Sequence, residues 1–225
     1  MEKKTVDLYQ KNIPAILDTL EQNFYDKKSL TTLNRMRENP DPFKLLISCL
    51  LSLRARDEVT ERISEELFKI ADTPKKIIEL DQKLLEKTIF SSGHYKKKAL
   101  VLKSVSREII ERFHNTVPDT KEELLSIKGI GPKTSNIVLS FVYKKQYLPI
   151  DSNCHRVSNR LSWVATKTPL ETEQTLEKIL PKKYWEEFNG IFMQFGRKIC
   201  VPVSPFCSTC PVSHLCPKIN VTKSR

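Results

Sequence analysis

The stretch that decides the fold is LSIKGIGPKTSNIVL, from Leu125 to Leu139. The chain has only five glycines, and two of them, Gly129 and Gly131, lie within three residues here. Glycine accepts a positive φ and a close backbone approach, so this spacing predicts a tight turn between two helices. A helix that begins at Pro132 would present unpaired N–H groups, which suit a phosphate. By spacing alone, an ordinary helix–helix turn is the simpler interpretation.

Outward from this turn, the pattern predicts helices and almost no strand-like alternation. Helix starts are well marked: Asp41–Pro42, Thr73–Pro74 and Thr168–Pro169 each place a capping residue before a proline at the first helical position. The fold class is therefore predicted to be all-α. We expect helices near residues 8–22, 43–53, 58–70, 82–90, 96–113, 121–127, 132–143, 153–161, 170–180 and 184–197.

Four cysteines gather near the C-terminus, with six, two and five residues between them: Cys200, Cys207, Cys210 and Cys216. Thiolates this close can enclose one soft metal centre. The segment from Val201 onward is rich in Pro and Cys, so we expect it to need a metal to be ordered. Zinc is the chemical alternative to an iron–sulfur cluster. Zinc modules usually present two short Cys pairs, however, and only Cys207 and Cys210 form one here.

The charge balance favours a polyanionic partner. Lys and Arg total 38 against 27 Asp and Glu, which gives a formal charge of +11 and a pI near 9.3. Such an excess favours nucleic acid, although a basic surface without a dedicated partner explains it as simply. No stretch is long and apolar enough to span a membrane, and the first thirty residues lack an apolar signal core. We therefore expect an intracellular protein whose clustered cysteines bind metal.

Taken together, these segments resemble the endonuclease III family of DNA glycosylases. The stretch LSIKGIGPKTSNIVL resembles the family's helix-hairpin-helix, and IDSNCHRVSNRL, from Ile150 to Leu161, resembles its aspartate segment. The cysteine spacing matches the family's iron–sulfur loop. LLSLRARDEVT (Leu50 to Thr60) and GHYKKKA (Gly93 to Ala99) also stand in the family's order, and the first is closer to archaeal and eukaryotic branches. The resemblance covers roughly residues 40–217.

The resemblance implies a two-lobed helix-hairpin-helix glycosylase fold with a C-terminal [4Fe-4S] loop. Residues 35–145 would form a helical domain that ends in the hairpin. Residues 1–34 and 146–225 would form a second domain that carries the cluster on the four cysteines. The residues between Cys200 and Cys207, VPVSPF, include none of the basic side chains that this loop offers to DNA in the family. We expect a monomer.

Two residues that follow the turn would carry the chemistry in this family, Lys133 and Asp151. Alone, Lys133 is most simply a solvated charge and Asp151 a helix N-cap. The resemblance implies that the Lys133 amine attacks C1′ of a damaged nucleotide and becomes a Schiff base, after which β-elimination cleaves the strand 3′ to the abasic site. The Asp151 carboxylate would stabilise the positive charge that develops on the sugar. The implied function is a bifunctional glycosylase and AP lyase for oxidised or damaged pyrimidines.

Two alternatives remain from the residues alone. A monofunctional mismatch or adenine glycosylase on this fold would use activated water, but it would normally lack a lysine at position 133. A non-catalytic DNA-binding iron–sulfur protein would keep the hairpin, the charge and the cluster. The presence of both Lys133 and Asp151 argues against this second alternative.

The implied partner is double-stranded DNA that contains damaged bases or abasic sites. In the hairpin, the expected DNA-contacting residues are Lys128, Gly129, Ile130, Gly131 and Thr134. Arg54 and His94 match side chains that fill the gap left by an extruded base, where many bacterial members have Gln and Leu. Phosphate contacts are expected from the helix start at Tyr95, Lys96, Lys97 and Lys98. Asn153 stands where the family often has His.

Overall fold

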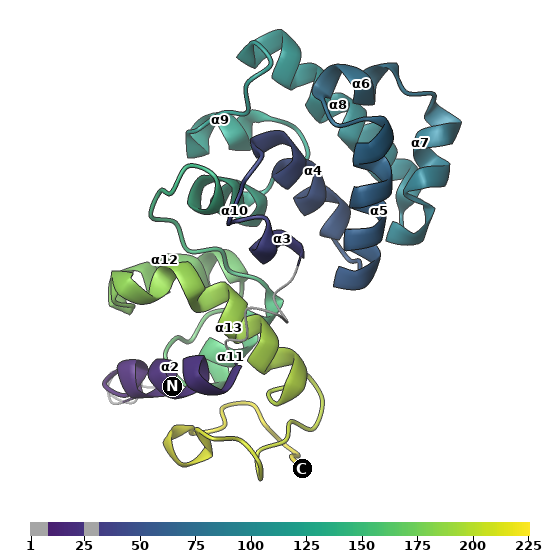
Figure 1. The fold of residues 1–225 in the computed structure, drawn as a ribbon. Coiled ribbons are helices and arrows are strands. Elements are labelled where there is room, and N and C mark those ends of the chain that lie inside the picture. The colour runs from purple at the N-terminus through teal and green to yellow at the C-terminus, as the bar shows by residue number, and fades with distance from the viewer. Residues whose placement is uncertain (1–8, 25–31) are drawn as a thin grey trace. The chain divides into compact units, whose positions relative to one another are not determined.

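The computed structural model describes residues 9–24 and 32–225 (Figure 1). The described residues form helices and loops with no strand among them, so the all-α prediction is confirmed. They cluster into two compact units. The central unit comprises residues 32–147, and the terminal unit comprises residues 9–24 and 148–225. None of the described helices combines the length and the apolar character needed to cross a membrane.

The central unit is a bundle of short helices around one apolar core. Asp41, Thr73, Asp81 and Thr120 each cap a helix by accepting a hydrogen bond from a backbone N–H in the first turn. Apolar side chains from α4, α5, α8 and α10 then meet in the interior. The elements are α3 (Thr32–Arg35), α4 (Pro42–Ser52), α5 (Asp57–Ile70), α6 (Pro74–Glu79), α7 (Gln82–Thr88), η2 (Phe90–Ser92), α8 (Tyr95–Phe113), α9 (Lys121–Ser126) and α10 (Pro132–Phe141).

A small second cluster in the central unit fixes α10 against α4. Leu45 and Cys49 on α4 pack with Ile137 and Phe141 on α10, and all four side chains are buried. Because α10 follows the glycine turn directly, this packing sets the direction in which the turn and the first residues of α10 project. The apolar helix expected over residues 43–53 is therefore α4, and it is buried along most of its length.

The terminal unit joins the N-terminal helix to the C-terminal third of the chain. Its core contains the fully buried Trp163, Phe188 and Phe192, with the Phe188 and Phe192 rings stacked at 4.1 Å between centroids. The elements are α2 (Ile13–Phe24), α11 (Ser152–Arg160), α12 (Pro169–Ile179), η3 (Lys182–Tyr184), α13 (Trp185–Lys198) and η4 (Ser213–Leu215). After α13 the chain has little regular structure, as the proline and cysteine content predicts.

The described helices differ from the expected ones at several points. The first helix was expected over residues 8–22; Tyr9 and Gln10 are helical, but a turn at Lys11 and Asn12 separates them from α2, whose start at Ile13 places Pro14 in the first turn. Residue 8 lies outside the described residues. The helix start at Thr73–Pro74 was predicted, but no range was predicted for α6, since six residues are too few to show a periodicity, and the four-residue α3 was not expected. The helix expected over residues 82–90 ends at Thr88 and is followed by the 3-10 turn η2.

Candidate active site

The turn between α9 and α10 needs glycine at one position for steric reasons. Gly129 has a φ of +106°, and a Cβ added there would lie 2.8 Å from Cγ1 of Val101 on α8. Both observations confirm the predicted positive φ and close approach. Gly131 is different, because its φ is −102° and an added Cβ would meet nothing within 4 Å. Space is therefore open beside the backbone of Gly131.

The N-terminus of α10 has no side-chain cap, which is also the case for α5, α8 and α13. Six helices (α4, α6, α7, α9, α11 and α12) carry an Asp or Thr cap whose side chain binds a backbone N–H. The cap of α10 is Gly131, which has no side chain to do this, and Pro132 follows at the first position. Lys128 and Gly129 are exposed, whereas Ile130 and Thr134 are buried. Of the five hairpin residues expected to contact DNA, Ile130 and Thr134 are therefore largely covered, whereas Lys128, Gly129 and Gly131 reach solvent.

Lys133 occupies the second position of α10 and is partly exposed. Its amine lies near the thiol of Cys49 on α4: burial raises the pKa of Cys49 to about 12, and the Lys133 charge acts in the opposite direction. Lys133 is thus close to the α4–α10 contact and still partly exposed to solvent, as a nucleophile for a macromolecular substrate must be.

Asp151 is the N-cap of α11, as its position in the sequence predicts. Its Oδ1 accepts hydrogen bonds from the backbone N–H groups of Asn153 and Cys154, both at 2.8 Å. Its Oδ2 accepts a bond from Nδ2 of Asn153 at 3.2 Å. The carboxylate is partly exposed, yet its orientation is fixed by three donors. Such a group can stabilise a positive charge without first reorganising.

A line of hydrogen bonds continues from Asn153 toward the cysteine loop. Nη2 of Arg156 donates to Oδ1 of Asn153 and to the Gly196 carbonyl, both at 2.9 Å, and its Nε donates to the Cys200 carbonyl at 3.1 Å. Burial lowers the pKa of Arg156, and the charges of Cys200 and Asp151 partly offset that shift. Asn153, which departs from the usual family residue, thus links the carboxylate to Arg156.

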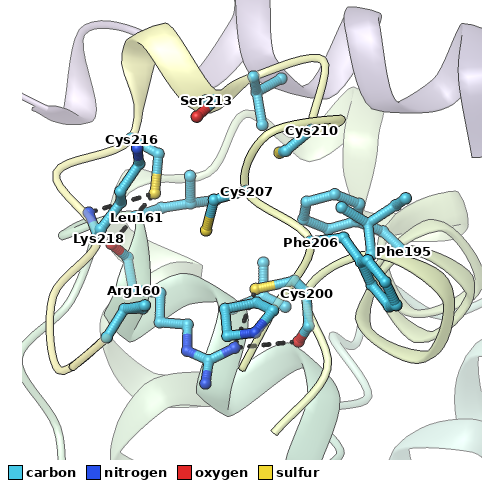
Figure 2. Close-up of a pocket in the computed structure, with 15 residues that line it drawn as sticks. Arg160, Leu161, Phe195, Cys200, Phe206, Cys207, Cys210, Ser213, Cys216 and Lys218 are labelled. Atoms are coloured by element: carbon cyan, nitrogen blue, oxygen red, sulfur yellow. Dashed lines mark hydrogen bonds between the residues drawn. The ribbon is translucent and has the colours of Figure 1, made fainter. Parts of the chain in front are cut away.

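The four clustered cysteines line one small cavity in the terminal unit (Figure 2), with a volume of about 20 Å³. Its other walls include apolar side chains of Leu161, Phe195, Ile199, Phe206 and Val212. All six cysteines of the chain are free thiols. Burial raises the pKa of Cys216 to about 11 and also raises that of Cys210. Within the described residues, no three His, Cys, Asp or Glu side chains converge closely enough to hold a single metal ion.

Hydrogen-bond donors point at two of these sulfurs. Nη1 of Arg160 lies 3.3 Å from Sγ of Cys200, and the backbone N–H of Lys218 lies 3.4 Å from Sγ of Cys216 (Figure 2). Hydrogen bonds of this kind stabilise sulfur ligands as thiolates and tune an iron–sulfur cluster. Four soft thiols around an apolar cavity, with N–H donors at the sulfurs, fit a [4Fe-4S] cluster by their chemistry.

Arg160, at the end of α11, holds both ends of this loop. Its guanidinium donates to the carbonyls of Cys200, Val201 and Pro202 at 3.1, 2.7 and 2.7 Å. Its own carbonyl accepts from the backbone N–H of Ile219 at 3.1 Å. Sequence reasoning missed both Arg160 and Arg156, which stand four residues apart on α11. That spacing places them on one helix face ahead of the cysteines, but two arginines on a polar helix usually indicate a solvated face.

Arg54 and His94, expected to enter DNA, are both exposed and both have left-handed backbones. Arg54 has a φ of 56° in the loop after α4, and His94 has a φ of 47° just before α8. The ring of Tyr95 pairs with that of Phe90 at 4.9 Å between centroids. Lys96 and Lys97 are exposed, as phosphate contacts would be. Lys98 was expected among these contacts, but it is buried, because it stands four residues before Leu102 on the apolar face of α8.

Residues 47–182 match the HhH-GPD superfamily of base excision DNA repair proteins. Endonuclease III of Thermotoga maritima is 44% identical over 182 residues, which cover 81% of this chain and 85% of that protein. Endonuclease III homolog 1, chloroplastic, of Arabidopsis thaliana is 33% identical over 78% of this chain, but the match spans only 48% of that longer protein. A solved trapped endonuclease III–DNA covalent intermediate superposes with a TM-score of 0.84 at 31% identity, covering 93% of this chain and 96% of that one.

Proposed function

Because the chain belongs to the HhH-GPD superfamily of base excision DNA repair proteins, we propose that it removes damaged pyrimidines from DNA with Lys133 as nucleophile. The resemblance to endonuclease III is confirmed, and with it the function as a base excision repair DNA glycosylase with AP lyase activity. The observation that carries the proposal is the position of Lys133, partly exposed at the second residue of the helix that the glycine turn begins.

The chemistry needs an amine at this position. The Lys133 Nζ attacks C1′ of the deoxyribose and displaces the damaged base. After the first amine proton is lost, the C1′–O4′ bond breaks as the second amine proton passes to O4′, which opens the sugar ring and gives a Schiff base. The imine acidifies the C2′ proton, and removal of that proton expels the 3′ phosphate by β-elimination. A hydroxyl side chain has only one proton to lose, and water leaves a hemiacetal whose aldehyde form acidifies the C2′ proton less than an imine does, so either nucleophile would stop after base removal. The presence of Lys133 therefore favours the bifunctional enzyme over the monofunctional one.

Asp151 has the complementary role in this proposal. Three donors fix its carboxylate, so the negative charge is in place before the sugar becomes positively charged. The negative charge of this carboxylate also suits it to accept the proton that the Lys133 amine loses.

DNA binding by the hairpin follows from the same geometry. A helix N-terminus without a side-chain cap presents backbone N–H groups and the positive end of the helix dipole, which suit a phosphate. The open space beside Gly131 lets a DNA backbone approach closely. Exposed Lys128 adds a positive charge next to this position. The implied partner is double-stranded DNA with a damaged base or an abasic site, bound through its phosphates.

The proposal includes a [4Fe-4S] cluster on Cys200, Cys207, Cys210 and Cys216. When bound, such a cluster supplies four metal–thiolate bonds that cross-link the loop. Arg160 and the Lys218 N–H would then donate to ligand sulfurs, and the apolar cavity walls would exclude water. The role that follows from these contacts is structural.

The test is borohydride trapping on a duplex with one abasic site. Wild-type protein should form a covalent adduct. In Lys133→Ala the rate of adduct formation should fall by on the order of a thousandfold or more. The matched control is Lys144→Ala, an exposed lysine just after the other end of α10, which should trap DNA as the wild type does. A panel of damaged bases would then define the substrate class.

Two results would redirect the assignment. Base release by the wild type without any adduct would leave the monofunctional glycosylase. DNA binding without base release or adduct, with the thiol loop intact, would leave a non-catalytic DNA-binding protein. An adduct that survives in Lys133→Ala would move the nucleophile to another amine.

A further inference from the structure

A buried lysine in the central unit ties two loops together. Lys98, on α8, is only 9% exposed, and its Nζ donates hydrogen bonds to the carbonyl oxygens of Leu51 at 2.7 Å and Ser92 at 2.8 Å. Leu51 lies in the last turn of α4, and Ser92 is the last residue of η2. The two carbonyls are 41 positions apart in the sequence, and the ammonium group bridges them.

Each bridged carbonyl stands shortly before a loop that carries an expected DNA-inserting side chain, Leu51 two residues before its loop and Ser92 directly before its loop. The first, which we term the Arg54 loop, comprises residues 53–56 between α4 and α5. The second, which we term the His94 loop, comprises residues 93–94 between η2 and α8. In both loops a residue other than glycine takes a left-handed backbone, which costs conformational energy and persists only where the surroundings enforce it.

We propose that Lys98 is a positioning residue that holds the Arg54 loop and the His94 loop in fixed register, so that both side chains enter DNA together where a base has been extruded. This inference rests on the proposed glycosylase function. In this proposal Lys98 contacts neither DNA nor the reacting atoms. Its side chain acts through the backbone from which Arg54 and His94 project.

A structural role alone does not account for a charged residue here. Removing an ammonium ion from water is costly, and burial accordingly lowers the pKa of Lys98 to about 8. The hydrogen bonds to two uncharged carbonyls offset part of that penalty. An apolar side chain of similar length would fill the same space without the penalty. What it would lose is the directional bridge between the two loops.

The same helix offers a matched control. Lys103 is half-buried on α8, and its Nζ also donates to two backbone carbonyls, those of Ile78 at 3.1 Å and Leu80 at 2.5 Å. These carbonyls belong to the end of α6 and the residue after it, and neither stands before a loop with an expected DNA contact. Lys103→Met therefore removes a bridge of the same chemistry from the same helix without touching the Arg54 and His94 loops.

The experiment measures gap filling without any catalysis. The probe is a duplex in which 2-aminopurine stands opposite a tetrahydrofuran abasic analogue that the protein cannot cleave. Wild-type protein at saturation should displace the 2-aminopurine and raise its fluorescence. Lys98→Met should bind the duplex but lose most of this rise, whereas Lys103→Met should keep it. A rise that is equal in Lys98→Met and wild type would overturn the proposal.

A second readout separates positioning from misfolding. We expect Lys98→Met to cleave an abasic site in a duplex roughly tenfold to a hundredfold more slowly than wild type. On a single-stranded abasic oligonucleotide, which has no gap to fill, its rate should stay close to wild type. An equal loss on both substrates would refute positioning. Lys98→Gln, which keeps a neutral NH2 donor group on a shorter side chain, provides a milder variant if Lys98→Met does not fold. If the wild type cleaves neither substrate, the lyase assignment fails, and the fluorescence assay still decides the role of Lys98.

Discussion

The hairpin between α9 and α10 and the cysteine loop after α13 are ordered by opposite means. The hairpin is short, its Ile127 and Ile130 are buried in the core of the central unit, and Gly129 fits closely against Val101. The cysteine loop has almost no regular structure, and its backbone carbonyls are held by the guanidinium groups of α11. Apolar burial orders the first region, while directed polar bonds and four thiols order the second.

This difference predicts which region depends on a metal. Burial of apolar side chains stabilises the hairpin whether or not a cluster is present, because none of its contacts involves a cysteine ligand. In the loop, the thiols surround a cavity instead of packing against one another. A buried thiol is held protonated in the absence of metal, so loading the loop couples proton release to folding. Variants in the two regions should therefore fail in different ways.

The largest effect is expected from loss of a cysteine ligand. Cys216→Ser should abolish the visible absorbance of an iron–sulfur cluster and destabilise the terminal unit by several kcal/mol, since metal binding free energy is folding free energy at such sites. Hydrogen exchange should show the amides of residues 199–225 losing protection, while those of α9 and α10 keep theirs. Cys49→Ala, in the core of the central unit, is the control that should leave the absorbance unchanged.

A smaller effect is expected from Arg160→Met. The change removes the donors to the Cys200, Val201 and Pro202 carbonyls and leaves those acceptors without them, at a cost on the order of 3 kcal/mol. The cluster should still assemble, since Arg160 supplies no thiolate, but it should be lost faster to a chelator or oxidant. The exposed Lys198→Met in the same unit should change neither quantity. Equal loss rates for the Arg160 variant and the wild type would contradict this account of the loop.

Substitutions at the two hairpin glycines, Gly129 and Gly131, should differ in their effect on stability, and the effect at Gly129 should be of intermediate size. Gly129→Ala should destabilise the central unit by about 2 kcal/mol, because it places a Cβ 2.8 Å from Val101 and forces alanine to a positive φ. Adding Val101→Ala should remove the clash and so recover that share of the lost stability. The cost of holding alanine at a positive φ should remain. The measurement is denaturant unfolding monitored by circular dichroism.

Gly131→Ala tests the opposite property of the same turn. Its φ is negative and the space around an added Cβ is open, so the free energy of unfolding should change by less than about 0.5 kcal/mol. DNA affinity should nevertheless fall, since the methyl group would occupy the position where a DNA backbone approaches. Unchanged affinity would mean that this open space is not used for binding.

Local spacing was sufficient to predict the parts of the molecule that depend on near neighbours. The glycine turn, the start of α10 at Pro132 and the capping role of Asp151 each follow from a few consecutive residues. Lys133 lies just inside the helix that begins at Pro132, as predicted, because its position depends only on that local helix start. No range was predicted for the short helix α6, because its one signal, the Thr73–Pro74 cap, had no apolar period behind it.

Local spacing did not predict the direction in which the long charged side chains point or the groups that they bind. Arg156 and Arg160 bind carbonyls about forty residues away in the sequence, so their inward direction depends on where α13 ends. Lys98 was expected to reach phosphates, but it turns inward to the carbonyls of Leu51 and Ser92. Its place one turn before Leu102 was the available signal, and a run of three lysines obscured it.

The sharpest separation between an effect on stability and an effect on activity is expected at Asp151. Asparagine caps helices as well as aspartate does, so Asp151→Asn keeps an acceptor for the backbone N–H groups of Asn153 and Cys154. Its free energy of unfolding should fall by at most about 0.5 kcal/mol, whereas Asp151→Ala should lose about 1 kcal/mol. Both variants lack the negative charge, and both should slow base release by roughly a hundredfold or more. If Asp151→Asn were as active as wild type, the carboxylate would be a cap alone, and stabilisation of the sugar cation would have to come from another group.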